Sequence, residues 1–343
     1  MSTILILRRG GGPHLTVQDL GRPGYLDHGL SRGGAADPLA LHEAAALLNQ
    51  PVGFAAVEMA GSGGVFEVTE NLRIALTGAP MHAHVDGRAL AWNASHVLPR
   101  AAVLTIGGAR EGVYGYLVPG GGIDTPLILG SRSAHRTAGV GRPLDTGMRL
   151  AIGTDDGAAS ANRQLDVLPR FAGGIVRAVP GLHFEMFSEA DRARFEAGRF
   201  TRDTRGNRMG ARFLPDGEGF AGATGLSVLS EVTLPGDIQV TGDGTPFVLL
   251  AECQTTGGYP RIGTVIPADL PKVAQAAPGT AIRFAFVSRD NALEAERAEA
   301  ARRDALPSRT RRLAFRPEDI PDLLSQQLIS GVTAGDDLER NRT

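Results

Sequence analysis

Three segments follow one another between residues 247 and 266. The first is apolar, Phe247-Val248-Leu249-Leu250-Ala251, and the second is polar, Gln254-Thr255-Thr256-Gly257-Gly258-Tyr259-Pro260-Arg261. The third is apolar again, Ile262-Gly263-Thr264-Val265-Ile266. Glycine pairs and proline interrupt strands, so the pattern predicts a strand, a loop at the edge of a sheet and a second strand. The loop carries an amide, two hydroxyls, a phenol and a guanidinium. Rigid strands often hold binding groups on such loops, although an ordinary polar turn has the same pattern.

The composition favours a mainly β protein with a few short helices. Glycine accounts for 46 of the 343 residues and aromatic residues for only 5%. Glycine spread through apolar stretches is typical of many turns between short strands. The formal net charge of −2 lacks the basic excess of a nucleic-acid-binding surface, so we expect no nucleic-acid partner.

The single cysteine, the single lysine and the N-terminal segment restrict the classes of protein that this sequence allows. Cys253 is the only cysteine, so no disulfide can form within the chain, and we expect a small buried side chain rather than a nucleophile. Lys272 is the only lysine, and no Walker motif is present. No apolar run is long enough to span a membrane, and the charges near the N-terminus follow its apolar residues. We therefore expect a cytoplasmic protein with no membrane partner.

The distribution of strand patterns predicts two lobes. We expect a β-rich N-terminal lobe over residues 1–157, a polar linker over 158–172 and a second β-rich lobe over 173–305. Residues 306–343 form an appended tail that we expect to be partly disordered. Within the tail, Ile320, Leu323, Leu324 and Leu328 mark a short amphipathic piece.

Local signals predict where helices and one hairpin begin. Asp37 and Pro38 are typical of an N-cap and a first helical residue, and Asp269 is expected to cap a second short helix. Ser188 begins a capping-box pattern, and a charged helix is predicted from Ser288 to Asp304. Asp86-Gly87 between alternating runs indicates a β-hairpin. Strands are expected at 1–9, 66–68, 72–76, 81–85, 89–92, 103–106, 113–118, 175–179, 226–234, 247–251, 264–266 and 282–287.

Two glycine-rich segments near the N-terminus could form a ligand site. In residues 16–25, Asp19 and Arg22 could pair with each other, or Gln18 and Arg22 could face a cleft. Residues 30–37 lead into the predicted helix, whose N-terminus could bind a phosphate or carboxylate unless Asp37 simply caps it.

Other polar clusters have alternative explanations. Residues 201–210 place three arginines around Asn207. This pattern is typical of a site for carboxylate or phosphate oxygens, and equally of a solvated basic loop. His82 and His84 alternate along a strand without a third ligand nearby, so we expect no metal. A nucleophile elbow of the serine-hydrolase type is absent from the sequence.

Six motifs occur in the order typical of one family. They are Thr16 to Tyr25, Gly34-Ala35-Ala36-Asp37-Pro38, Ala75 to Ala79, Gly120 to Asp124, Asn207-Arg208-Met209-Gly210 and Gln254 to Arg261. Over roughly residues 3–300 the chain resembles the C subunit of the bacterial ATP-dependent 5-oxoprolinase. This family is also called allophanate hydrolase subunit 2, KipA-like, or the biotin-dependent carboxyltransferase family.

The resemblance implies a fold, partners and cofactors. It implies two tandem cyclophilin-like β-barrel lobes, a KipI-like B subunit as partner and, in the oxoprolinase system, an A subunit. It also implies ATP with Mg in the complex and a small amide substrate. Family members also occur fused in urea carboxylase, where this region is part of the carboxyltransferase site and biotin is the cofactor.

The resemblance leaves three functions open. ATP could phosphorylate the lactam oxygen of 5-oxoproline before water opens the ring to give glutamate, or carboxybiotin could carboxylate the nitrogen of urea. A third possibility is a non-catalytic, KipA-like regulator that binds a KipI-like protein. We favour the oxoprolinase because the 343 residues include no biotin carboxylase and no biotinyl domain.

Both chemistries need cationic and amide groups around a developing charge. We expect catalytic roles for Arg208, Gln254 and Tyr259. We expect Gln18, Arg22, Asn207, Thr255, Arg261 and Lys272 to bind substrate, with Lys272 as a donor in the biotin chemistry. The site could be shared with the partner protein.

Overall fold

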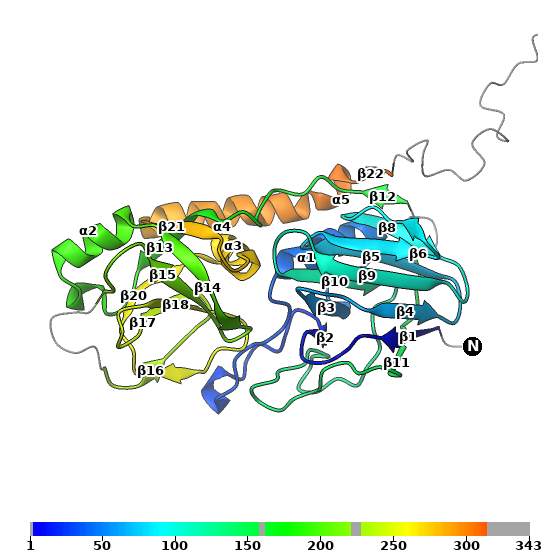
Figure 1. The fold of residues 1–343 in the computed structure, drawn as a ribbon, viewed down its shortest axis with the longest axis horizontal. Helices are drawn as coiled ribbons and strands as arrows, with labels where there is room; N and C mark the ends of the chain where they lie inside the picture. The colour runs from blue at the N-terminus through cyan, green and yellow to red at the C-terminus, as the bar shows by residue number, and fades with distance from the viewer. Residues whose placement is uncertain (1–2, 158–161, 221–227, 314–343) are drawn as a thin grey trace, which may run out of the picture. The chain divides into compact units, whose positions relative to one another are not determined.

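The computed structural model describes residues 3–157, 162–220 and 228–313. The described residues up to Arg312 form one compact unit. The amphipathic piece expected around Ile320 to Leu328 lies outside the described residues. The structure is mainly β with a few short helices, so this expectation is confirmed (Figure 1).

Two sheets form the first lobe. One has the order β11-β1-β4-β9-β6-β7: β1 (Ile4–Arg9), β4 (Val65–Val68), β6 (Met81–Val85), β7 (Arg88–Ala89), β9 (Val103–Ala109) and β11 (Arg149–Ala151). The other has the order β2-β3-β10-β5-β8-β12-β22: β2 (Leu15–Gln18), β3 (Ala56–Ala60), β5 (Leu72–Gly78), β8 (Ala94–Leu98), β10 (Tyr114–Pro119), β12 (Arg163–Gln164) and β22 (Arg311–Arg312). Asp86 and Gly87 have φ of 47° and 84°, which confirms the hairpin predicted between β6 and β7.

Strands β5 and β10 are buried on both faces. Ile74, Leu76 and Leu117 belong to the apolar cluster between the two sheets. Ala75 and Tyr116 alternate with them and belong to a second cluster, which contains residues of helix α1 (Pro38–Leu48) and of the second lobe. Successive strand residues point to opposite faces, so one strand contributes to both cores. One face of this sheet therefore packs against α1 and against the second lobe.

A closed seven-stranded barrel forms the second lobe, in the order β13-β20-β17-β18-β15-β14-β21. The strands are β13 (Gly174–Pro180), β14 (Phe200–Asn207), β15 (Gly210–Pro215), β17 (Asp237–Val240), β18 (Pro246–Leu249), β20 (Arg261–Val265) and β21 (Ala281–Phe286). Phe195, Phe200 and Phe284 pack in its core with ring centroids 4.9 to 5.1 Å apart. A small sheet, β16 (Glu231–Val232) with β19 (Thr256–Gly257), lies outside the barrel.

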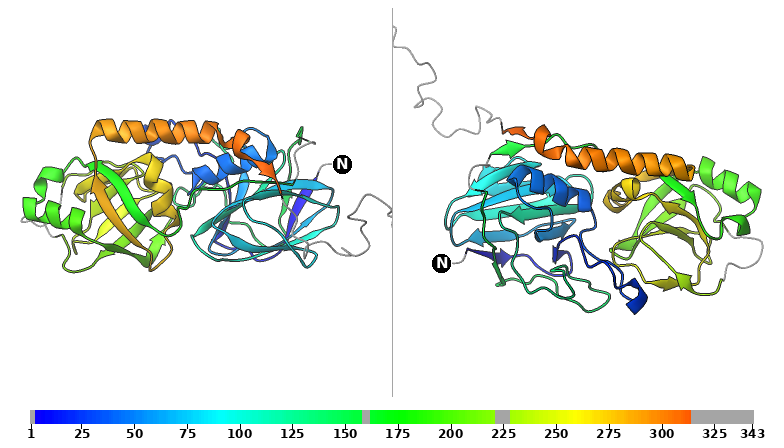
Figure 2. Two further views of the ribbon diagram at one scale, coloured as in Figure 1. Left: turned by 90° about the horizontal axis from the view of Figure 1, so that it is seen from above. Right: turned by 180° about the vertical axis from the view of Figure 1, so that it is seen from behind.

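Helices connect and cover the strands. They are α2 (Glu189–Ala197), α3 (Leu270–Gln275), α4 (Arg289–Asp304) and α5 (Leu306–Arg309), with the 3-10 turns η1 (Leu26–His28), η2 (Phe184–Met186) and η3 (Pro267–Asp269). Helix α4 contacts both β13 of the barrel and α1 of the first lobe (Figure 2). Ser188 accepts from the backbone N–H of Asp191, which confirms the predicted cap of α2. No helix among the described residues has the length and apolar character needed to cross a membrane.

Three local expectations need correction. Asp37 does not cap α1 with its side chain, because its Oδ2 accepts from Arg170 Nε at 2.7 Å and from Gln275 at 2.8 Å. Asp269 does not cap α3 either, because its carboxylate accepts two hydrogen bonds from the guanidinium of Arg177. Residues 201–210, considered as a solvated loop, form β14 and the tip of the β14–β15 hairpin.

The strand expected at 226–234 is described only from residue 228, where β16 covers two residues. In the segment expected as a linker, Leu165 and Arg170 are buried. Arg170 forms ion pairs with Asp37 at 2.7 Å and with Glu43 at 2.8 Å. This arginine therefore joins the segment to the start of α1.

Candidate functional site

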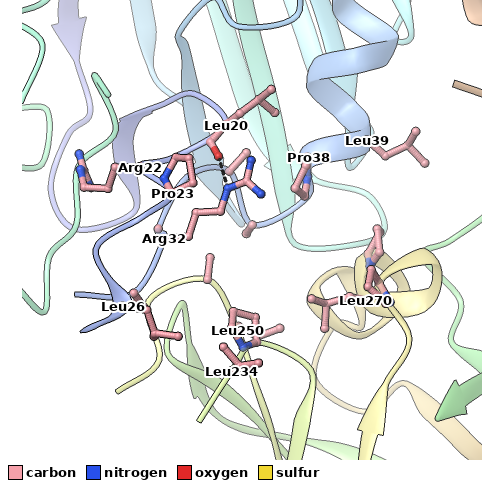
Figure 3. Close-up of a pocket in the computed structure, with 18 of the residues that line it drawn as sticks. Leu20, Arg22, Pro23, Leu26, Arg32, Pro38, Leu39, Leu234, Leu250 and Leu270 are labelled. Carbon is pink, nitrogen blue, oxygen red and sulfur yellow. Dashed lines mark hydrogen bonds between the residues drawn. The ribbon is translucent and has the colours of Figure 1, made fainter. Parts of the chain in front are cut away.

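A cleft of about 550 Å³ opens between the first-lobe segment 20–42 and the second lobe (Figure 3). Its lining is mostly apolar: Leu20, Leu39, Leu234, Leu250 and Leu270 are examples. Clefts of this size and character, with a few polar groups, are the usual form of a small-molecule site. The lining residues with polar side chains are Arg22, Tyr25, Ser31, Arg32, His42, Glu296, Glu299 and Arg303.

Backbone hydrogen bonds hold the first-lobe wall of the cleft. The N–H of Arg22 donates to the carbonyl of Arg32 at 2.8 Å, and the N–H of Gly33 donates to the carbonyl of Ala251 in the second lobe at 3.0 Å. Gly34 has φ of 84°, and a Cβ there would lie 2.6 Å from the backbone nitrogen of Gly21. Only glycine fits a positive φ at such a close approach of two chain segments.

Arg32 is one of the two arginines, with Arg303 of α4, whose side chains line the cleft beside Arg22. Its Nε donates to the carbonyl oxygen of Leu20 at 2.8 Å, which fixes the guanidinium near the centre of the cleft (Figure 3). Among the described residues, neither an ion pair nor a hydrogen bond occupies its two Nη groups. A guanidinium with free Nη groups can bind a carboxylate or phosphate through two parallel hydrogen bonds.

The first turn of α1 adds to this positive potential. Pro38 and Leu39 line the cleft, the turn contains no acidic residue, and Asp37 is turned toward Arg170 and Gln275. Helix N-termini carry a partial positive charge that favours anions. The carboxylate of Glu296, which also lines the cleft, accepts a hydrogen bond from the backbone N–H of Ala268 at 2.6 Å. We infer that this part of the cleft suits a small anion.

A buried polar network lies behind the same wall. Arg208 Nε donates to Glu252 at 2.5 Å, Nη1 donates to Glu58, and Nη2 donates to the carbonyl of Gly34. The hydroxyl of Tyr116 also donates to Glu58, at 2.7 Å. Burial, and then the charge of Glu58, raise the pKa of Tyr116 well above its ordinary value, so this hydroxyl stays protonated.

Of the nine residues predicted for the site, Arg22 alone lines this cleft. Its guanidinium extends away from the centre of the cleft and donates to the carbonyl oxygen of Ser133 (Figure 3). Arg22 and Asp19 do not form an ion pair; Asp19 instead accepts from Ser131 at 2.6 Å and from Ser133 at 2.5 Å. Gln18 is buried and donates to Thr16 and to the carbonyl of Ala134.

The predicted residues of segment 254–261, between strand β18 and the start of β20, do not line the cleft. The amide of Gln254 is 3.4 Å from that of Gln239, Thr255 is half-buried, and Tyr259 is 44% exposed. Arg261 is engaged by Glu231 at 2.7 Å and by Asp237 at 3.1 Å.

The last two predicted residues are also separate from the cleft. Asn207 is exposed and accepts from the N–H of Met209, which stabilises the hairpin turn. Lys272 pairs with Asp269 at 3.0 Å and donates to the carbonyl of Ile175. The structure therefore does not gather the nine residues into one site.

Sequence reasoning did not name Ser31, Arg32 or His42 individually. A signal for the first two existed, because residues 30–37 were considered as an anion site at a helix N-terminus, and this segment forms the cleft wall. The described residues contain no cluster of three or more His, Cys, Asp or Glu side chains that could hold a metal ion.

Comparison with known proteins identifies the family. Residues 28–286 match the model of the carboxyltransferase domain, subdomain A and B, and the chain belongs to this family. It is 35% identical over 292 residues to the C subunit of 5-oxoprolinase from Escherichia coli strain K12, covering 83% of this chain and 92% of that protein. The C subunit of the Haemophilus influenzae 5-oxoprolinase is 31% identical over 286 residues, covering 82% and 91%.

More distant similarity extends to much longer proteins. Urea amidolyase of Saccharomyces cerevisiae is 25% identical over 304 residues, which cover 81% of this chain and 16% of the yeast protein. The solved structure of K. lactis urea amidolyase has the same fold, with a TM-score of 0.79 and 23% identity, over 88% of this chain and 20% of that one.

Proposed function

We propose that this chain is the C subunit of an ATP-dependent 5-oxoprolinase, which converts 5-oxoproline, ATP and water into glutamate, ADP and phosphate. The observation that carries the proposal is the 35% identity to the C subunit of a 5-oxoprolinase over most of both chains. The proposed partners are a KipI-like B subunit and an A subunit, and ATP with Mg would act in the complex.

The cleft suits this substrate chemically. 5-Oxoproline has a carboxylate, a lactam and an apolar ring edge. Arg32 and the N-terminus of α1 offer donors and positive potential for the carboxylate, and Leu39, Leu250 and Leu270 offer apolar surface for the ring. We propose this cleft as the substrate site on this chain.

The residues first considered for catalysis take different proposed roles. Arg208 would act as a positioning residue, because each of its three nitrogens already donates to an acceptor. The exposed Tyr259 and the half-buried Gln254, which belong to the same segment 254–261, would contribute only where a partner protein covers this segment. This division supports a site that is completed by the partner.

A biotin-dependent urea carboxylase, with this chain as its carboxyltransferase component, is the second candidate. The similarity to the yeast urea amidolyase favours it. Urea and the ureido ring of biotin also present a planar amide group, and carboxybiotin carries a carboxylate on that ring, so the free Nη groups of Arg32 suit either chemistry. The identity to the C subunits of two 5-oxoprolinases over most of both chains therefore favours 5-oxoproline.

The test is ATP hydrolysis and glutamate release by the complex reconstituted with its partners, with and without 5-oxoproline. We expect both to depend on 5-oxoproline. Arg32→Ala is expected to raise KM for 5-oxoproline at least tenfold, because a charge-assisted hydrogen bond is worth about 1.5–3 kcal/mol.

Arg283→Ala is the matched control, because Arg283 is an exposed arginine on β21 outside the cleft. A correctly assembled complex without 5-oxoproline-dependent ATP hydrolysis would contradict the proposed function. An unchanged KM in Arg32→Ala would contradict the placement of the substrate.

A further inference from the structure

A serine and a histidine form a buried pair at the wall of the cleft. Ser31 lines the cleft and is 2% exposed, and His135 lies behind it with the same exposure. Ser31 Oγ and His135 Nε2 are 2.8 Å apart. Serine next to histidine can be a nucleophile with its base or an oriented hydroxyl, and the second nitrogen of the ring distinguishes the two.

The other ring nitrogen of His135 is an acceptor. The backbone N–H of Ala138 donates to Nδ1 at 3.2 Å. A neutral imidazole carries one proton, so an accepting Nδ1 places that proton on Nε2. His135 therefore donates to Ser31 Oγ, and it has no lone pair left to remove the proton of Ser31.

The hydroxyl hydrogen of Ser31 is consequently available. Its oxygen already accepts from His135, and among the described residues Ser31 Oγ has no other hydrogen-bond partner. A buried donor is rarely left unused, because its desolvation costs about 1–3 kcal/mol. The unused donor belongs to a residue that lines the cleft, next in sequence to Arg32.

We propose that Ser31 is a specificity-determining residue, whose hydroxyl, oriented by His135, donates a hydrogen bond to a carbonyl oxygen of the ligand in the cleft. This inference rests on the proposed function in one respect, because both take the cleft as the site where the ligand binds. A neutral hydroxyl suits an amide carbonyl, and the neighbouring guanidinium suits a carboxylate. 5-Oxoproline offers both groups, whereas urea and biotin offer the amide carbonyl.

The surroundings keep His135 in the required form. Burial lowers its pKa, the charge of Glu252 acts in the opposite direction, and Arg22 and Arg208 lower the pKa further. A protonated ring would carry a proton on Nδ1, which would oppose the N–H of Ala138. The neutral ring is thus the form that keeps the serine hydroxyl directed toward the cleft.

The test is calorimetric binding of 5-oxoproline, urea and biotin, each alone, to the reconstituted complex. Ser31→Ala is expected to weaken the Kd of whichever compound binds about tenfold, the loss of one hydrogen bond. His135→Leu, which cannot donate, should weaken it as well, and His135→Gln, whose amide can donate, should restore most of the affinity. Ser308→Ala is the control, because Ser308 is exposed and bonds only to the carbonyl of Ala305 among the described residues.

Each outcome is decisive. An unchanged Kd in Ser31→Ala overturns the role of Ser31, and so does equal weakening by His135→Leu and His135→Gln at unchanged thermal stability. Binding of urea or biotin but not of 5-oxoproline, with the Ser31 effect present, supports this inference while contradicting the proposed function. Binding of none of the three by the wild-type complex contradicts both.

Discussion

Arg208 of the barrel donates a hydrogen bond to Glu58 of the first lobe, and both side chains are buried. Asn207 pairs with Gly210 across the β14–β15 hairpin, so Arg208 and Met209 form its two-residue tip. The arginine reaches from this tip to Glu58 on β3 and to the carbonyl of Gly34. One side chain thus fixes the barrel to the wall of the cleft.

Removing this arginine is expected to destabilise the protein strongly. Arg208→Ala leaves the carboxylates of Glu58 and Glu252 buried without their cation, which typically costs about 3–5 kcal/mol. Urea denaturation measures the loss. Arg208→Lys keeps the charge but not the three-way geometry, so its free energy of unfolding is expected to lie between wild type and alanine.

Arg205→Ala in the strand that leads to this tip is the control, because the Arg205 side chain is exposed and its partner Asp203 keeps a second ion pair with Arg212. It is expected to cost less than about 1 kcal/mol. Equal losses in Arg208→Ala and Arg205→Ala would show that the buried network does not hold the lobes. Retained stability with abolished kcat would instead support a catalytic role for Arg208.

Sequence patterns predicted the mainly β fold, because strand alternation and turn residues are local signals. Asp86-Gly87 fixed its hairpin through the positive φ of both residues, and Ser188 capped its helix by accepting from the backbone N–H of Asp191, three residues further on. The resemblance to the C subunit of 5-oxoprolinase rested on six motifs and is confirmed by the family match over residues 28–286 and by the 35% identity to the Escherichia coli C subunit.

The site was less predictable because its contacts join distant parts of the chain. Arg208 and Arg261 have the residue type of an anion site, but each meets carboxylates far away in sequence, such as Glu58 and Asp237. Asp37 has the residue type and position of a helix N-cap, yet its carboxylate accepts a hydrogen bond from Arg170, 133 residues away in the sequence. No local pattern distinguishes an arginine with free donors, such as Arg32, from one whose donors are occupied.

A methyl group at Gly34 is expected to disrupt the cleft wall. Its φ is 84°, and a Cβ would lie within 2.7 Å of backbone atoms of both Leu20 and Gly21, which cannot move independently. Strain and overpacking together are expected to lower the free energy of unfolding by about 3 kcal/mol in Gly34→Ala. Thermal and urea unfolding measure this effect.

Gly29→Ala separates the two causes. Gly29 has a similar φ of 78°, but no atom lies within 4 Å of its Cβ position. Its alanine variant therefore reports backbone strain alone and is expected to lose about 1 kcal/mol. If both variants lost the same amount, the close approach of the segments around Gly21 and Gly34 would not constrain the wall.

Three buried or half-buried histidines are expected to lower the stability of the folded chain in mild acid, and Glu43, whose pKa burial raises to about 7, acts in the opposite direction. Burial lowers the pKa of His42, His96 and His135 below the ordinary value of 6.5. As the pH falls through about 6.5, these side chains bind protons in the unfolded chain but not in the folded one, so their contribution to stability decreases until the lowered folded pKa values are reached. Urea denaturation between pH 7.5 and 5.5, compared between the wild type and a variant that lacks one of the histidines, measures this contribution.

Replacing His96 with glutamine should reduce this pH dependence. Glutamine can still donate to the carbonyl of Ala91, which His96 Nε2 contacts at 2.8 Å, but it binds no proton. His82→Gln is the control because His82 is exposed. The same pH dependence in the wild type and in His96→Gln would contradict the assignment of His96.

Cys253 is expected to be unreactive in the folded protein. Burial, reinforced by the charge of Asp237, raises its pKa to about 12. The thiolate is the nucleophilic form, so at pH 8 nearly all of the side chain is the inert thiol. A thiol-specific disulfide reagent should therefore detect one thiol in the denatured chain and almost none in the native one. Because this is the only cysteine, labelling of the native protein within minutes would contradict the burial directly, and Cys253→Ala serves as the blank.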